Sequence, residues 1–196
     1  MNYVVLSGSE DHLLEYVRSL WHGRRPGLGI KYRMRDLAQD SGEYLSALRN
    51  LRTLTLSNIA VEHISEREFC TCFSAFRGSL TRLSLDTFAT SFSAFVTLID
   101  YFPNITTLRL HSFRLKPDEG PVPSLSRPLR GKLDVQEVPA SHLEFFDRFA
   151  ELGLEYEELL LDSPFLSVST KFLESALQIS SSTVKFLRLT AELECK

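Results

Sequence analysis

The chain has 196 residues, 43% of them hydrophobic and 24% charged, and its formal net charge at pH 7 is −3. That composition is ordinary for a soluble protein. The small negative charge gives no electrostatic reason to expect binding to nucleic acid or to an anionic membrane. No apolar run approaches the roughly 20 residues that span a bilayer. We therefore predict neither nucleic acid nor membrane as a partner.

The cysteines and the N-terminal residues favour an intracellular location. The three cysteines are odd in number, and Cys70 and Cys72 lie two residues apart on an expected helix, which is poor geometry for a disulfide. Residues 1–6 lack the positively charged and long apolar regions of a secretory signal. We predict a reducing compartment, either the cytoplasm or the nucleus.

Residues 1–50 are irregular and fit two interpretations. Residues 11–21 could form one amphipathic helix, or a short helix near residues 9–15 could precede a strand in which Val17, Leu20 and His22 take repeat positions. We favour the strand, and expect another at residues 4–6. Residues 18–35 hold six basic and no acidic residues. They could bind phosphate or an acidic partner segment, but a solvated loop around residues 26–29 is the favoured interpretation.

From residue 51 one leucine phrase recurs six times, and its copies begin at Leu51, Leu80, Ile105, Lys132, Tyr156 and Val184. The first leucine of each closing pair falls at positions 54, 83, 108, 133, 159 and 187, at intervals of 29, 25, 25, 26 and 28 residues. Self-similarity at 20–29 residues is the signature of leucine-rich repeats. Each copy predicts a strand with its leucines inward and positions such as 53, 55 and 57 outward.

The segments between most of these strands predict helices. Residues 65–68 and 141–144 match capping boxes, and Phe92, Phe95, Ile99 and Phe102 recur at helical spacing before Pro103. Residues 170–179 also carry a helical pattern. Residues 112–128 differ, because four prolines exclude a helix and favour an extended segment.

Together these elements predict one α/β domain over residues 1–196, with an irregular part at 1–50 and clear repeats at 51–190. The predicted fold is a right-handed leucine-rich-repeat solenoid, with a parallel sheet on the concave side and helices plus one proline-rich segment on the convex side. The usual asparagine position is taken instead by Ile59, Phe88, Phe113, Val138, Pro164 and Glu192. We expect apolar packing to replace the asparagine hydrogen bonds in at least four of these units.

The outward strand positions predict a mixed-charge face for a protein partner. Neighbouring strands lie roughly 4.8 Å apart, so Arg109 can pair with Asp134 and Asp86 with His111. The alternative is a solvated face whose charges merely pair with one another. The predicted protein-binding residues are Thr55, Arg82, Ser84, Asp86, Arg109, His111, Asp134, Gln136, Glu158, Asp162 and Arg188.

Catalytic and metal-binding interpretations find little support in the sequence. Asp86, His111 and Asp162 could suggest a metal site, but Asp162 lies two strands from His111, at roughly 10 Å, which is too far to share an ion. No phosphate-binding glycine loop, nucleophile elbow or zinc-protease motif occurs. We predict no catalytic residue, no metal and no cofactor.

Residues 48–56 (LRNLRTLTL) and 101–110 (YFPNITTLRL) resemble the repeats of fungal, basidiomycete-type F-box/leucine-rich-repeat proteins, and residues 16–21 (YVRSLW) are similar to an early strand of their repeat region. In that family an N-terminal F-box recruits a ubiquitin-ligase scaffold, and the repeats select a protein target. The resemblance implies the target-selecting role. No F-box precedes these repeats in the sequence, so a ligase scaffold is a partner only if one lies upstream.

Neither end of the repeat array carries a recognisable polar cap, which solenoids generally need. We therefore expect a segment of a longer protein, or ends that a partner covers. The alternative to a binding module is a truncated repeat fragment without independent function.

Overall fold

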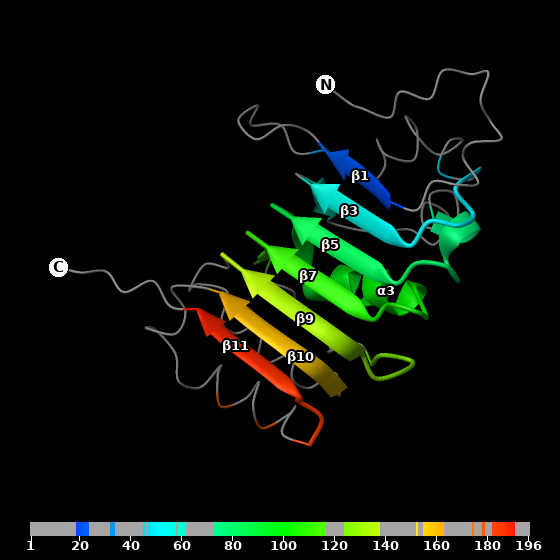
Figure 1. The fold of residues 1–196 in the computed structure, drawn as a ribbon. Coiled ribbons are helices and arrows are strands. Elements are labelled where there is room, and N and C mark those ends of the chain that lie inside the picture. Colours follow the sequence, from blue (N-terminus) through cyan, green and yellow to red (C-terminus); the bar gives the residue numbers. More distant parts are fainter. Residues whose placement is uncertain are drawn as a thin grey trace.

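Two parallel sheets form the framework of this chain in the computed structural model (Figure 1). The structure describes residues 19–23, 32–33, 45, 47–57, 59–61, 73–116, 124–137, 152, 155–162, 174, 178 and 182–190. The larger sheet has seven strands in chain order: β1 (Ser19–Gly23), β3 (Thr53–Ser57), β5 (Arg82–Asp86), β7 (Thr107–His111), β9 (Arg130–Gln136), β10 (Glu155–Asp162) and β11 (Phe186–Thr190). The predicted α/β class with a parallel sheet is therefore confirmed, and the arrangement is compatible with a solenoid.

The favoured interpretation of the N-terminal region is confirmed where the structure describes it. Strand β1 pairs with β3, and places Leu20 opposite Leu54 and His22 opposite Leu56. Leu20 and His22 thus take the repeat positions expected of them. Val17, the strand expected at residues 4–6 and the basic residues other than Arg33 lie outside the described residues.

The leucines of the recurring phrase form the core, as predicted. Successive leucines stack in register across the sheet, and Leu54, Leu83 and Leu108 are each only 1% exposed. Fully removing such a side chain from water stabilises the fold by about 1.5–3 kcal/mol. Leu187 is the exception at 36% exposed, because β11 is the last strand of the described sheet and has a neighbour only on the β10 side.

The chain also forms a second parallel sheet, which was not predicted from the sequence. Each of its short strands comes directly after a strand of the larger sheet in chain order. Its strands are β2 (Tyr32–Arg33), β4 (Ile59–Val61), β6 (Ala89–Ser91) and β8 (Arg114–Lys116). Between the sheets the chain turns at Thr87 and Ser112, whose φ angles are 49° and 48°, and Glu137 has the same left-handed conformation after β9. The Thr87 amide donates to the His111 carbonyl at 2.9 Å, and the Ser112 amide to the Gln136 carbonyl at 3.0 Å. Each corner is thus held by the next unit along the sheet.

Phe88 and Phe113 lie between the two sheets, at two of the six positions where the sequence predicted apolar packing in place of asparagine, and this packing is confirmed at both. Phe88 and Phe113 are both fully buried, and their rings stack at 6.2 Å with an interplanar angle of 4°. The Phe95 ring also contacts Phe113, with their centroids 5.2 Å apart. Side chains at the other four asparagine positions lie outside the described residues.

The predicted helix around Phe92 is also confirmed. Helix α3 (Phe92–Tyr101) lies behind the larger sheet in Figure 1, and it buries Phe92, Phe95 and Ile99. The Ser91 hydroxyl accepts the Ala94 amide at 3.2 Å, which satisfies one of the donors left free at a helix start. The helix ends before Pro103, as expected. A single turn of 3-10 helix, η2 (Ser74–Phe76), buries Phe76 one unit earlier. Among the described residues no helix is long and apolar enough to span a membrane.

The described parts of the proline-rich segment contain no helix, as predicted. Residues 114–116 form β8, and residues 124–129 are irregular. Both the amide and the hydroxyl of Ser126 donate to Asp100 of α3, at 2.9 and 2.6 Å. These two hydrogen bonds hold residues 124–129 against the C-terminal end of α3. Of the helix predicted after the capping box at residues 65–68, the structure describes only the end, residues 73–76, where one helical turn buries Phe73 and Phe76. The helices predicted after residues 141–144 and at residues 170–179 fall outside the described residues, apart from isolated positions.

Gly131 should resist substitution by alanine. Its φ angle is +97°, and an added Cβ would overlap the Thr106 carbonyl oxygen, which accepts the Lys132 amide at 2.8 Å. We expect Gly131→Ala to lower the free energy of unfolding by at least about 2 kcal/mol, measured by urea denaturation. Gly78→Ala is the matched control because nothing lies within 4 Å of its added Cβ. Equal losses in the two variants would contradict this account.

The stacked phenylalanines should contribute strongly to stability. Phe113→Ala removes a fully buried ring that contacts both Phe88 and Phe95. We expect it to lower the free energy of unfolding by about 3–5 kcal/mol, and Phe113→Leu to cost much less because it leaves a smaller cavity. Urea denaturation of both variants measures this difference. A loss below about 1 kcal/mol for Phe113→Ala would mean that the stack does not hold the units together.

Candidate functional site

The candidate site is the face of the larger sheet opposite α3, which we call the open face. It carries the outward residues of each strand, and their predicted alignment is confirmed in full. Thr55, Ser84, Arg109, Asp134, Leu160 and Arg188 are successive register partners. So are Thr53, Arg82, Thr107, Lys132, Glu158 and Phe186, and likewise Ser57, Asp86, His111, Gln136, Asp162 and Thr190. The repeats therefore bring residues 25 to 29 positions apart into contact.

All eleven predicted site residues lie on these aligned positions. The exposed ones are Arg82, Arg109, Glu158 and Arg188, and the half-buried ones are Thr55, Ser84, Asp86, His111, Asp134 and Gln136. Asp162 is in register with Gln136, and its side chain lies outside the described residues. Strand order puts β10 two strands from β7, so the predicted separation of Asp162 from His111 is confirmed.

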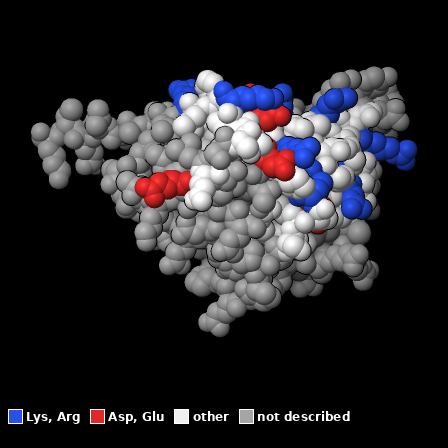
Figure 2. All heavy atoms as spheres, turned by 90° about the horizontal axis from the view of Figure 1, so that it is seen from below, with Lys and Arg blue, Asp and Glu red and all other residues white. Residues whose placement is uncertain are grey.

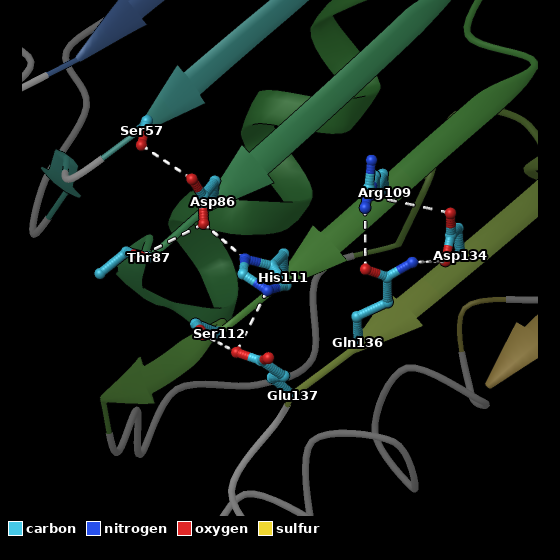
Figure 3. A network of polar contacts seen from close by, with 9 residues as sticks. All are labelled: Ser57, Asp86, Thr87, Arg109, His111, Ser112, Asp134, Gln136 and Glu137. Carbon is cyan, nitrogen blue, oxygen red and sulfur yellow. Dashed lines mark hydrogen bonds and ion pairs between the residues drawn. The ribbon is translucent and has the colours of Figure 1, made fainter. Parts of the chain in front are cut away.

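His111 bridges two carboxylates at the end of β7 (Figure 3). Its Nδ1 lies 2.6 Å from Asp86 Oδ1, which confirms the predicted pair, and its Nε2 lies 3.1 Å from Glu137 Oε2. An ionised carboxylate only accepts hydrogen bonds, so both contacts are satisfied together when both ring nitrogens carry a proton. The bridge spans three strands and fixes the imidazole ring in one orientation.

Hydroxyl groups complete the environment of these two carboxylates. Ser57 donates to Asp86 Oδ2 at 2.9 Å, and Thr87 donates to Asp86 Oδ1 at 3.2 Å. Ser112 donates to Glu137 Oε2 at 3.1 Å. Burial by itself raises the pKa of the Asp86 carboxyl, but the hydrogen bonds from His111 and Ser57 and the charge of His111 outweigh it. The pKa of Asp86 therefore lies below its ordinary value.

A second polar cluster surrounds Arg109 (Figure 3). Arg109 Nε lies 3.8 Å from Asp134 Oδ2, so the predicted ion pair is present but long. The shorter contact runs through Gln136, whose Oε1 accepts from Arg109 Nη2 at 2.8 Å and whose Nε2 donates to Asp134 at 2.9 Å. The three side chains form a closed triangle that orients the guanidinium while leaving its side chain 48% exposed.

The C-terminal end of the open face has a different character. Phe186 is 52% exposed on β11, next to Glu158 in register. Half-buried Leu160 lies between Asp134 and exposed Arg188. Lys132 and Glu158 approach to 3.6 Å. This end therefore offers apolar area together with an exposed arginine.

Several residues that contact Asp86, His111 or Glu137 were not predicted from the sequence. Ser57 was expected to point to solvent, yet it is only 3% exposed and donates to Asp86. Thr87, Ser112 and Glu137 were not predicted at all, because strand alternation says nothing of a residue beyond the strand end. Their left-handed conformation carries these side chains back over the strand ends. The available signal was a polar residue directly after five of the six leucine strands, all but β11.

The contacts of Ser57 differ from those of a serine nucleophile. A serine nucleophile needs its hydroxyl against a general base such as an imidazole, whereas the Ser57 hydroxyl donates to a carboxylate. Within the described part of the chain, no group of three or more His, Cys, Asp or Glu side chains is placed to hold a metal ion. Cys70 and Cys72 lie outside that part.

Comparison with known proteins adds no further constraint, since no protein-family model, no curated protein and no solved structure matches this chain.

The Asp86 network should make stability depend on pH in the acid range. A carboxyl whose pKa is lower in the folded than in the unfolded state stabilises the fold above its unfolded pKa, near 3.8 here. That contribution is lost as the pH falls through the folded value. We expect Asp86→Asn to remove about 1 kcal/mol at pH 6 and to flatten the decline between pH 5 and 2.

Urea denaturation at several pH values measures this effect. Glu157→Gln is the charge-matched control, since it removes an exposed carboxylate that pairs with Lys185. If the wild type and Asp86→Asn lose stability in parallel from pH 5 to pH 2, the network does not act as described.

Proposed function

We propose that this chain is a leucine-rich-repeat solenoid that binds a protein through its open face and catalyses no reaction. The observation that carries the proposal is the pre-ordered polar surface around Arg109 and His111. Their neighbouring side chains already hold both groups in place, so binding costs little side-chain entropy.

The repeat geometry supports the solenoid. Six strands with a common leucine pattern pair in register at spacings of 25 to 29 residues, and short second strands follow three of the leucine strands, β3, β5 and β7. That arrangement favours one supersecondary unit per repeat, each contacting its neighbours only. A right-handed coil is the expected hand for parallel strands joined in this way.

The residues of the open face suit a protein partner. Both signs of charge occur on it, and complementary charge gives specificity and steers association more than it adds raw affinity. Arg188 and the exposed Phe186 lie at one end, and aromatic and arginine side chains are the residue types that most often dominate protein interfaces. We place the partner's apolar anchor at this end and its polar contacts over the two clusters.

The resemblance to fungal F-box/leucine-rich-repeat proteins extends the proposal. On that basis the chain would select the target of a ubiquitin ligase inside the cell, with the scaffold recruited by an F-box elsewhere. Sequencing the transcript upstream of Met1 tests this part separately. A continuous frame without an F-box helical segment would remove the ligase role and leave the binding role intact.

Charge reversal at the Arg109 triangle should abolish target binding. We expect proteins recovered with the wild-type chain from cell extract, and identified by mass spectrometry, to be lost with Arg109→Glu/Asp134→Arg. Surface pairs contribute little to folding, so the variant should keep its thermal unfolding midpoint within a few degrees. Lys185→Glu/Glu157→Lys reverses a similar exposed pair outside the open face and serves as control. Recovery of the same proteins by all three chains would remove the open face as the binding site.

A further inference from the structure

The edge at which the strands of the larger sheet begin is rich in Lys and Arg. Figure 2 views the molecule of Figure 1 from below, and Lys and Arg side chains lie along the top and on the right of this view, the right being the side on which the strands begin. Asp and Glu side chains lie nearer the centre and left. This strand-start edge comprises Arg49, Arg52, Arg82, Arg130, Lys132 and Lys185.

On the C-terminal half of this edge each cation has an acidic partner from a neighbouring unit. Arg130 Nε lies 2.7 Å from Glu155 Oε2, and Lys185 Nζ lies 2.8 Å from Glu157 Oε2. Lys132 Nζ lies 3.6 Å from Glu158 Oε2. These pairs satisfy the positive charge locally, so this half presents no net attraction to an anion.

The N-terminal half differs, because Arg49, Arg52 and Arg82 are all exposed and none forms an ion pair with any described residue. We call these three the arginine cluster. The Arg82 amide donates to the Arg52 carbonyl at 2.9 Å, and the Ser79 hydroxyl donates to the Arg49 carbonyl at 3.0 Å. Backbone contacts between two adjacent units thus place these three exposed arginines at or just before the starts of β3 and β5, beside one corner of the open face.

We infer that the arginine cluster binds an acidic segment, rich in Asp or Glu, of the protein that the open face recognises. A guanidinium group matches a carboxylate through two parallel hydrogen bonds. Three such groups from two adjacent units can meet successive carboxylates of an extended chain. The cluster deepens the proposed function and depends on it. The apolar anchor and the acidic segment of the partner would lie at opposite ends of the open face.

The charge balance favours an acidic protein segment over nucleic acid. The whole chain is negatively charged, at −3, and carboxylates line the other half of the edge and the strand ends. A long polyanion would meet these carboxylates, whereas a short acidic segment needs only the corner that the arginines occupy.

Titration with a synthetic peptide of ten glutamates tests the inference. Binding is followed by NMR through the backbone amides and the Nε–H groups of the arginines in the full chain. We expect the largest shifts at Arg49, Arg52 and Arg82, and no binding of a ten-glutamine peptide. Arg52→Glu/Arg82→Glu should weaken binding of the glutamate peptide at least about tenfold.

Arg130→Glu/Lys185→Glu is the matched control, since it makes the same change in net charge on the paired half of the edge. It should weaken binding less than about threefold. Equal weakening by both double variants would overturn the inference, because binding would then follow net charge alone. Tighter binding of a ten-nucleotide single-stranded RNA than of the glutamate peptide would also overturn it, in favour of nucleic acid.

The two proposals fail in distinguishable ways. If Arg52→Glu/Arg82→Glu leaves glutamate binding unchanged while Arg109→Glu/Asp134→Arg still loses its target, only the acidic-segment inference falls. If the Arg109 and Asp134 variant keeps its target, the open face itself is wrong as the binding site.

Discussion

In-register parallel pairing is the constraint on which the rest of this structure depends. Each leucine strand lies beside the next with equivalent positions opposite one another, from Thr53 and Arg82 through to Glu158 and Phe186. A shift of one residue would move every leucine from the core to solvent, so the buried leucines hold the register. Once the register is fixed, every outward side chain acquires a neighbour one repeat away. The polar clusters of the open face are a consequence of leucine burial.

The corners between the two sheets show how the same constraint reaches beyond the strands. Thr87 and Ser112 adopt a left-handed conformation that costs about 1–2 kcal/mol for a residue with a Cβ. The cost is offset because each corner amide bonds to the next unit and each following phenylalanine packs in a buried stack. In addition, the corner side chains reach Asp86 and Glu137. One local conformation therefore closes the core and supports the edge of the candidate site.

Charged side chains are distributed unevenly over the larger sheet. They differ between the starts and the ends of the strands, and between the N-terminal and C-terminal units. On the strand-start edge, glutamates of the β10 unit pair with Arg130 and Lys185, while Arg52 and Arg82 of the β3 and β5 units form no ion pair with a described residue. At the strand ends, two carboxylates enclose His111. A partner would thus meet a surface with a defined polarity from one end to the other. Such asymmetry fixes the direction in which an extended partner can lie, which supports selective binding.

The sequence by itself determined the repeat period, the buried leucines, helix α3, and the register that pairs Asp86 with His111 and Arg109 with Asp134. These features follow from local periodicity, which one chain displays without reference to its fold. Three features became visible only in the tertiary structure. They are the second sheet, the hydrogen bonds of Gln136 to Arg109 and Asp134, and the contact between His111 and Glu137. They depend on backbone turns after the strand ends and on side-chain geometry between units, and neither is encoded in the spacing of residue types. The lack of an ion pair between Arg52 or Arg82 and any described residue also belongs with them, since it depends on which acidic side chains the fold brings near.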